Sequence, residues 1–181
     1  IDIGYLGGPR AEQGFDVLQQ WIHSPNLVDL SFLLRLRKEQ EALLSLSTKA
    51  SDRLTVLQGS YDDTEYMNLY FRCRYILLPY TRDYIGKLSG IFCDAIATST
   101  PVIAPRIPPF TEYFKQYGPL GILFDFTSSP DKAICEVIQS QSNYILFQSN
   151  LAKAKAAHSR TRIQGTLKVI VDELSKSTSH S

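Results

Sequence analysis

The sequence predicts an α/β protein with a Rossmann-like parallel sheet that carries helices on both faces. Two observations predict this class. Short β-rich runs alternate repeatedly with amphipathic runs of helix length, and several β-rich runs are apolar almost throughout, as in parallel strands buried on both faces. The chain has 181 residues, of which 44% are hydrophobic and 20% charged, so it is long enough for one domain with a substantial core.

The first half of the chain reads as strand-and-helix pairs in succession. Residues 1–8 are apolar and end in paired glycines, and the spacing of Phe15, Leu18, Trp21 and Ile22 predicts a helix directly after them. The other elements expected in this half are a strand in the later part of 27–37, a helix at 38–46, a strand at 53–59 and a helix at 64–73.

The second half continues this alternation and then becomes helical only. We expect strands at 75–80, 101–104 and 121–126, with helices at 90–97 and 109–116 between them. Beyond residue 131, the apolar stripes that predict C-terminal helices are formed by Ile134, Val137 and Ile138 and by Leu167, Ile170, Val171 and Leu174.

The organisation of the chain favours a single domain over residues 1–181. No internal repeat or Pro-, Gly- or Ser-rich linker divides the sequence, and the polar residues 176–181 are expected to form a disordered tail. Because the chain opens on Ile1 and moves straight into a strand-like run, without a signal-like flank, we interpret it as a piece of a longer protein.

Composition excludes several classes of function. The formal charge is only +1, and no basic block of the kind that binds nucleic acid or anionic lipid occurs. No apolar run approaches the roughly 20 residues of a transmembrane helix. The three cysteines, Cys73, Cys93 and Cys135, are odd in number and far apart, so neither a disulfide framework nor a cysteine metal site is indicated. We expect them to be buried thiols and the protein to be cytoplasmic.

Candidate binding loops follow the predicted strands, because ligands of open α/β sheets bind outside the carboxyl ends of the strands. In the loop at 7–14, Gly8 allows the backbone to approach a ligand and Arg10 is placed to clamp a phosphate; a plain tight turn with a surface arginine is the alternative. The loop matches neither the dinucleotide glycine pattern nor a phosphate-binding P-loop. In the loop at 59–63, Asp62 or Asp63 is expected to be the N-cap of the following helix, and Ser60 and Tyr61 are candidates to face a base.

The loop at 80–90 is the most informative of these segments. Ser89 and Gly90 open a helix, and a helix start offers unpaired N–H groups and the positive end of the dipole to an anion, with Lys87 adding charge nearby. Asp94, one turn further, offers a carboxylate that accepts hydrogen bonds from the two hydroxyls of a ribose. The alternatives are that Ser89 serves only as an N-cap and that Asp94 is an exposed helix residue.

Neither nucleophilic catalysis nor metal binding is indicated by the pattern. The histidines, His23, His158 and His180, lie outside the loops that follow the strands, and we interpret them as surface or capping residues. No His, Cys, Asp and Glu cluster with metal-ligand spacing occurs. We therefore expect no metal and no bound cofactor.

The order of several motifs resembles the C-terminal domain of GT-B glycosyltransferases of the group 1 type. In that family an apolar strand ending in Leu-Pro leads to a helix reading approximately Glu-Ala-Met-Ala-x-Gly-x-Pro-Val-Ile-Ala. Residues 77–80 read Leu-Leu-Pro-Tyr, the Ser-Gly step stands at 89–90, and residues 94–104 read Asp-Ala-Ile-Ala-Thr-Ser-Thr-Pro-Val-Ile-Ala. Residues 7–16 and the helix after Gly59 add further agreement, and the similarity runs over about 5–126.

The resemblance implies a nucleoside diphosphate sugar as donor substrate and glycosyl transfer, with retention, to an acceptor hydroxyl. By similarity, Arg10 contacts the diphosphate, Ser89 and Gly90 hold it through backbone amides, and Asp94 binds the ribose. Ser60 and Tyr61 would lie near the base. Arg10 and Lys87 would supply positive charge where the diphosphate leaves. An N-terminal domain of the same chain would bind the acceptor, and this part alone would be inactive.

Two departures from the family pattern keep an alternative open. Gly86 stands where the family has the first acidic residue of its donor-binding motif, and Gln13 stands where it usually has a phosphate-binding lysine. These residues favour a catalytically decayed binding or regulatory module of the same fold. A sugar-nucleotide epimerase is a further alternative, although the loops offer few acids or histidines for it.

Overall fold

The computed structural model describes residues 1–7, 13–36, 52–126, 132–159 and 164. It confirms the predicted α/β class: one six-stranded, all-parallel sheet has the strand order β3-β2-β1-β4-β5-β6. The strands are β1 (Ile3–Tyr5), β2 (Phe32–Arg35), β3 (Leu54–Leu57), β4 (Tyr75–Leu77), β5 (Val102–Pro105) and β6 (Gly121–Phe124).

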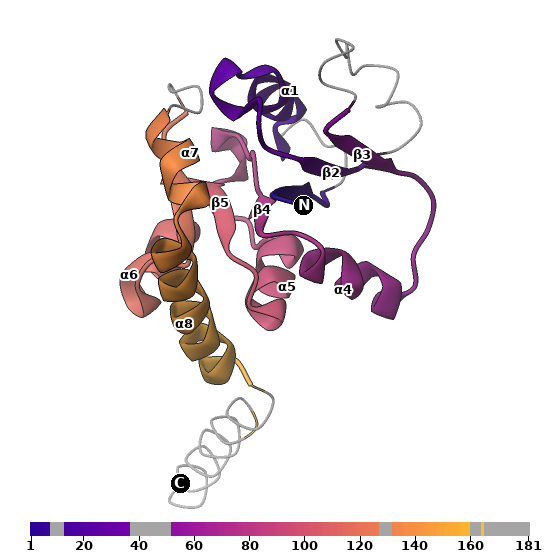
Figure 1. The fold of residues 1–181 in the computed structure, drawn as a ribbon. Helices are drawn as coiled ribbons and strands as arrows, with labels where there is room; N and C mark the ends of the chain where they lie inside the picture. Colours follow the sequence, from indigo (N-terminus) through magenta and orange to yellow (C-terminus); the bar gives the residue numbers. More distant parts are fainter. Residues whose placement is uncertain (8–12, 37–51, 127–131, 160–163, 165–181) are drawn as a thin grey trace, which may run out of the picture.

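Helices cover both faces of this sheet, as Figure 1 shows. The α-helices are α1 (Phe15–His23), α4 (Asp63–Phe71), α5 (Gly90–Thr98), α6 (Phe110–Tyr117), α7 (Lys132–Gln139) and α8 (Gln141–Ala157), and the short 3-10 helices are η2 (Pro25–Leu27) and η3 (Arg82–Tyr84). The helix expected at 38–46, the apolar stripe of the last expected helix (Leu167, Ile170, Val171 and Leu174) and the tail at 176–181 lie outside the described residues.

Strand side chains alternate between two hydrophobic cores because successive residues of a strand point to opposite faces. Tyr75 and Leu77 of β4 pack in the core beneath α1 and α7, whereas Ile76 packs in the core beneath α4, α5 and α6. Helix α8 contributes to both cores, since Phe147 belongs to the first and Leu151 to the second. The continuous apolar runs of the sequence are thus explained by burial on both faces.

The helix starts follow the capping signals of the sequence. Asp62 caps α4: its side chain accepts a hydrogen bond from the Glu65 backbone N–H (2.8 Å), and the Glu65 carboxylate accepts one from the Asp62 N–H (3.1 Å). Arg53, at the start of β3, donates to the carbonyls of Ile22, Leu27 and Leu30 and so ties β3 to the end of α1 and the turn after it.

The turn into α1 depends on Gly14. This residue has a φ of +67°, and a Cβ built on it would lie 1.7 Å from the carbonyl oxygen of Pro79, in the segment that follows β4. The start of α1, which Gly14 precedes, therefore lies directly against the backbone that follows β4. Only a residue without a side chain permits both the left-handed backbone and the contact.

We expect Gly14→Ala to lower the free energy of unfolding by about 3 kcal/mol or more, because steric overlap with backbone adds to the strain of the left-handed conformation. Gly59→Ala is the matched control: Gly59 has a φ of +104° but open space around its Cβ position, so its cost is about 1–2 kcal/mol. Urea unfolding of both variants measures the difference, and equal losses would contradict the importance of the contact.

Candidate functional site

The candidate site lies where the strand order reverses. The chain runs outward from β1 through β2 to β3 and then returns to the other side of β1 with β4, so β1 and β4 are neighbours whose connections leave in opposite directions. In open α/β sheets this reversal opens a crevice at the carboxyl ends of the two strands. The segments after β1 and after β4 are therefore the ones expected to bind a ligand.

Three elements meet at the carboxyl end of β1. A Cβ built on Gly7 would lie 3.4 Å from the Ile91 side chain in the first turn of α5. The Tyr66 hydroxyl of α4 lies 3.5 Å from the Leu6 carbonyl oxygen. The ends of β1, α4 and α5 thus converge at this point, although Leu6, Tyr66 and Ile91 are far apart in the sequence.

The start of α5 is built around the buried Ser89 side chain. Ser89 is the N-cap: its hydroxyl oxygen accepts a hydrogen bond from the Phe92 N–H (3.1 Å), and it lies 2.8 Å from the Tyr80 hydroxyl. Burial is the main reason that the pKa of Tyr80 is raised, so Tyr80 stays protonated. Because the Ser89 hydroxyl is occupied by its hydrogen bonds to Tyr80 and Phe92, backbone N–H groups are the donors that a ligand can use here.

Gly90 makes this helix start open. The residue is exposed, and a Cβ built on it would meet nothing within 4 Å. The first turn of α5 therefore presents unpaired N–H groups and the positive end of the helix dipole to an accessible surface. Such an arrangement suits an anion, as the sequence predicts.

Asp94 lies one turn further along α5, about 6 Å along the helix axis from Gly90. It is half-buried rather than exposed, and the Tyr70 hydroxyl of α4 donates a hydrogen bond to its Oδ2 atom (3.2 Å). Burial raises the pKa of the Asp94 carboxyl above its usual value, and the hydrogen bond from Tyr70 partly offsets this by lowering it. The expectation that Asp94, read alone, is an exposed helix residue is therefore wrong.

Arg35 is a residue of this region that the sequence analysis missed. It lies at the end of β2, and its guanidinium carbon stands 5.2 Å from the ring centre of Tyr66 and 5.8 Å from that of Tyr61. Strand alternation from Leu33 would have placed it on the face that α4 covers, next to these tyrosines. Tyr61 in turn donates from its hydroxyl to the Gln58 carbonyl (3.3 Å), and Ser60 is exposed beside it.

The remaining predicted site residues either lie in the loop before α5 or fall outside the described residues. Lys87 is exposed and lies 5.9 Å from the ring centre of Tyr84, in the loop before α5. Gly8 and Arg10 lie outside the described residues, so their roles stay predictions. Gln13 has a buried side-chain oxygen that finds no hydrogen-bond partner among the described residues, and a ligand group is able to satisfy it.

Metal binding finds no support in the part of the chain that the structure describes, where no group of three His, Cys, Asp or Glu residues is placed to hold an ion. Among the described residues, no helix is long and apolar enough to cross a membrane. The expectation of three buried thiols is correct only for Cys73, because Cys93 is exposed and Cys135 is half-buried. Cys93 lies on α5 where the helix faces outward.

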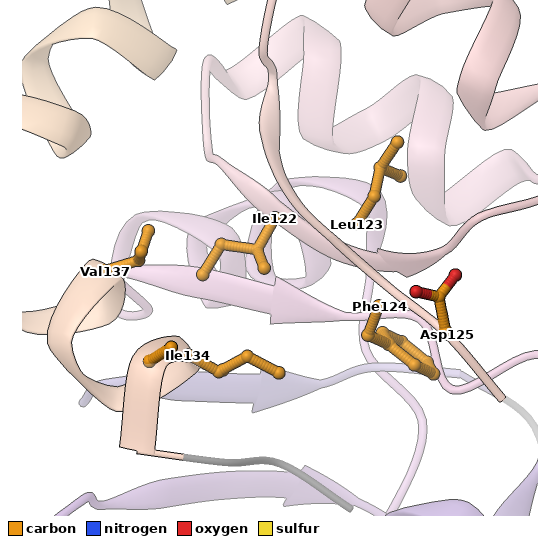
Figure 2. A pocket seen from close by; sticks show the side chains of 7 residues that line it. Ile122, Leu123, Phe124, Asp125, Ile134 and Val137 are labelled. Carbon is orange, nitrogen blue, oxygen red and sulfur yellow. The ribbon is translucent and has the colours of Figure 1, made fainter. Parts of the chain in front are cut away.

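Two surface hollows lie near β5 and β6. One, of about 540 Å³, follows β5 and β6 and contains the ion pair between Arg106 and Asp125 (3.1 Å) and the Phe126 ring beneath Arg82. The other, of about 230 Å³, lies between β6 and α7. Figure 2 shows Ile122 and Ile134 gathered there, while Leu123 points to the opposite face of the strand. Apart from the Asp125 carboxylate, the side chains that line this second hollow are apolar.

Comparison with solved structures identifies the fold. The sucrose-phosphate synthase of Thermosynechococcus elongatus superposes with a TM-score of 0.69 at 17% identity over 97% of this chain and 45% of that protein. The HepE protein of Anabaena, solved with UDP, gives 0.67 at 18% identity over 96% of this chain and 48% of that protein. A C-terminal domain of a group 1 family glycosyltransferase from Francisella tularensis gives 0.65 at 14% identity over 87% of this chain and 85% of that domain.

The chain has the fold of a GT-B glycosyltransferase C-terminal domain. It spans less than half of the length of the first two proteins and matches most of the isolated third domain. No protein-family model and no curated protein matches the sequence. The family resemblance in the motifs at 77–80 and 94–104 is therefore confirmed at the level of the fold.

We expect Ser89→Ala to lower the free energy of unfolding by about 2 kcal/mol or more, because it removes an N-cap and leaves the buried Tyr80 hydroxyl without that partner. Ser140→Ala is the matched control, since Ser140 caps α8 by accepting from the Asn143 N–H in a more exposed setting. It should cost about 1 kcal/mol. Chemical denaturation measures both, and a smaller loss for Ser89→Ala would contradict this account.

Proposed function

We propose that this chain is the nucleotide-sugar-binding domain of a glycosyltransferase that moves a sugar from a nucleoside diphosphate sugar to an acceptor hydroxyl, with retention. The observation that carries the proposal is the pairing of an open helix start at Gly90 with the Asp94 carboxylate one turn later, at the reversal of the strand order. An anion site and a hydroxyl-accepting carboxylate about 6 Å apart suit the diphosphate and the ribose of one nucleotide.

The proposed roles of the residues follow from their chemistry. Backbone N–H groups of the first turn of α5 would bind the diphosphate, and Asp94 would accept hydrogen bonds from the ribose hydroxyls. Tyr61 and Ser60 would lie beside the base. In the transfer, the bond between the anomeric carbon and the phosphate oxygen breaks, and the new bond forms to the acceptor oxygen. Arg10 and Lys87 would stabilise the negative charge that develops on the leaving diphosphate.

The fold of the neighbours supports this assignment, and one of them, HepE, was solved with UDP and with UDP-glucose. A decayed binding or regulatory module is the second candidate. It is favoured by Gly86, which offers no side chain to the donor sugar, and by Gln13, which carries no charge for the phosphates. Both candidates predict nucleotide binding by this chain, and only the first predicts transfer by the whole protein.

We expect calorimetric titration of the chain with UDP, GDP and ADP to show binding of one nucleotide at micromolar to millimolar concentration. Asp94→Ala should weaken it about tenfold to a hundredfold, because charge-assisted hydrogen bonds to the ribose are lost. Arg10→Ala should weaken it as well. Asp83→Ala, which removes an exposed carboxylate of η3, is the control and should leave the affinity unchanged. Absence of binding by any nucleotide to the folded chain would contradict the proposal.

We expect nucleotide affinity to fall as the pH drops through the pKa of Asp94, because only the ionised carboxylate accepts from two hydroxyls. Because burial raises this pKa, the full nucleotide affinity is reached only above the raised pKa. As the pH falls, the affinity is lost at a higher pH than it would be for an ordinary aspartate. The nucleotide phosphates titrate too, so the same series on Asp94→Asn gives the background. Affinity curves of identical shape for the two proteins would show that Asp94 does not bind the ribose.

A further inference from the structure

A chain of hydroxyl groups reaches the Asp94 carboxylate from α4. The Tyr70 hydroxyl lies 3.2 Å from Asp94 Oδ2, and the Tyr66 hydroxyl lies 3.3 Å from the Tyr70 oxygen. An ionised carboxylate only accepts hydrogen bonds, and each tyrosine has a single proton to donate. Tyr70 therefore donates to Asp94, and its oxygen is left to accept from Tyr66, whose single proton is shared with the Leu6 carbonyl oxygen 3.5 Å away.

The surroundings keep both hydroxyls protonated. Burial, as the largest cause, and the hydrogen bond with Tyr66 raise the pKa of Tyr70, and burial also raises the pKa of Tyr66. The Arg35 guanidinium, 5.2 Å from the centre of the Tyr66 ring, lowers the pKa of Tyr66 in part and makes its hydroxyl a better donor. Tyr70 thus remains a hydrogen-bond donor throughout the pH range in which Asp94 titrates.

Packing alone requires only the ring of Tyr70. The side chain is fully buried between α4 and α5, where it belongs to the core with Leu69 and Phe92, and its ring meets that of Tyr66 edge-on at 5.6 Å. A phenylalanine would fill the same space without the cost of burying a hydroxyl. That cost is offset here by a carboxylate which is itself half-exposed at the candidate site.

We propose that Tyr70 is a positioning residue, which fixes the Asp94 carboxylate through Oδ2 and so leaves Oδ1 to accept the ribose hydroxyls of a bound nucleotide. This inference rests on the nucleotide-binding function proposed above. A carboxylate held by one oxygen loses little freedom when a ligand binds to the other, which favours affinity. The hydrogen bond also stabilises the ionised form that the ligand requires.

The test compares Tyr70→Phe with Tyr75→Phe in the 181-residue chain. Tyr75 is the matched control, because it is equally buried but lies on the other face of the sheet, where its hydroxyl reaches the Val137 carbonyl at 3.5 Å. The first readout is the titration of the Asp94 side-chain carbon by NMR without nucleotide, assigned with Asp94→Asn. We expect its midpoint to move to higher pH in Tyr70→Phe and to stay in place in Tyr75→Phe.

The second readout is calorimetric binding of UDP, 2′-deoxy-UDP and 3′-deoxy-UDP. Tyr70→Phe should weaken UDP binding about threefold to tenfold and should reduce the preference for UDP over the deoxy analogues. A purely structural role would weaken all three nucleotides equally. The Tyr75→Phe chain should bind all three as the unchanged chain does.

Tyr66→Phe is the second variant, and it keeps the Tyr70 hydroxyl while removing the group that donates to it. We expect the Asp94 midpoint to move in the same direction by less. An Asp94 titration midpoint that is unchanged in both variants overturns the positioning role, whatever the nucleotide affinities are. If the titration shifts but Asp94→Ala retains full UDP affinity, the ligand part of the inference fails together with the proposed ribose site.

Discussion

The parallel pairing of β1 with both β2 and β4 is the constraint on which the rest of the molecule depends. Because β1 is central, it is buried on both faces, and its neighbours must approach closely. Gly4 leaves room for Cys73 on one face, where a Cβ would lie 2.5 Å from the Cys73 sulfur. Beyond the strand, Gly14 lies against the Pro79 carbonyl. The start of α1 and the segment after β4 are thereby held side by side.

This arrangement explains why the candidate site forms at that edge. Parallel strands bring all their carboxyl ends to one side, and the reversal of strand order separates the two connections that leave β1 and β4. The start of α5 is held at this edge of the sheet because the buried Ser89 hydroxyl is hydrogen-bonded to the Tyr80 hydroxyl. The open start at Gly90 is thus fixed by buried polar contacts on its inner side, a requirement for a preorganised anion site.

A polar layer of tyrosines connects the sheet to this site. The layer runs from the end of β2 to α5 through ring and hydroxyl contacts, in the order Arg35, Tyr66, Tyr70 and Asp94. Such a layer is expensive to bury unless each hydroxyl finds a partner, and here each one does. It adds contacts with a fixed direction to the hydrophobic packing between α4 and α5. The helix pair is therefore oriented with respect to β1 as well as held against it.

The sequence by itself determined the parallel α/β fold, because continuous apolar runs and amphipathic helices alternate along the chain. It also determined the helix start at Ser89 and Gly90 and the cap at Asp62, since capping depends on a few adjacent residues. Because these signals are local, they can be recognised without knowing which residues are neighbours in the folded chain.

The tertiary structure alone decided which partners the site residues have. Asp94 reads as an exposed helix residue in isolation, and only the packing of α4 on α5 brings Tyr70 to its carboxylate. Arg35 lies beside Tyr61 and Tyr66 only because the fold brings the end of β2 next to α4 and the loop before it. Cys93, expected to be buried from its apolar surroundings, is exposed because its helix turns that side outward. Contacts between residues distant in sequence depend on strand order and helix rotation, and neither is encoded in any short segment of the chain.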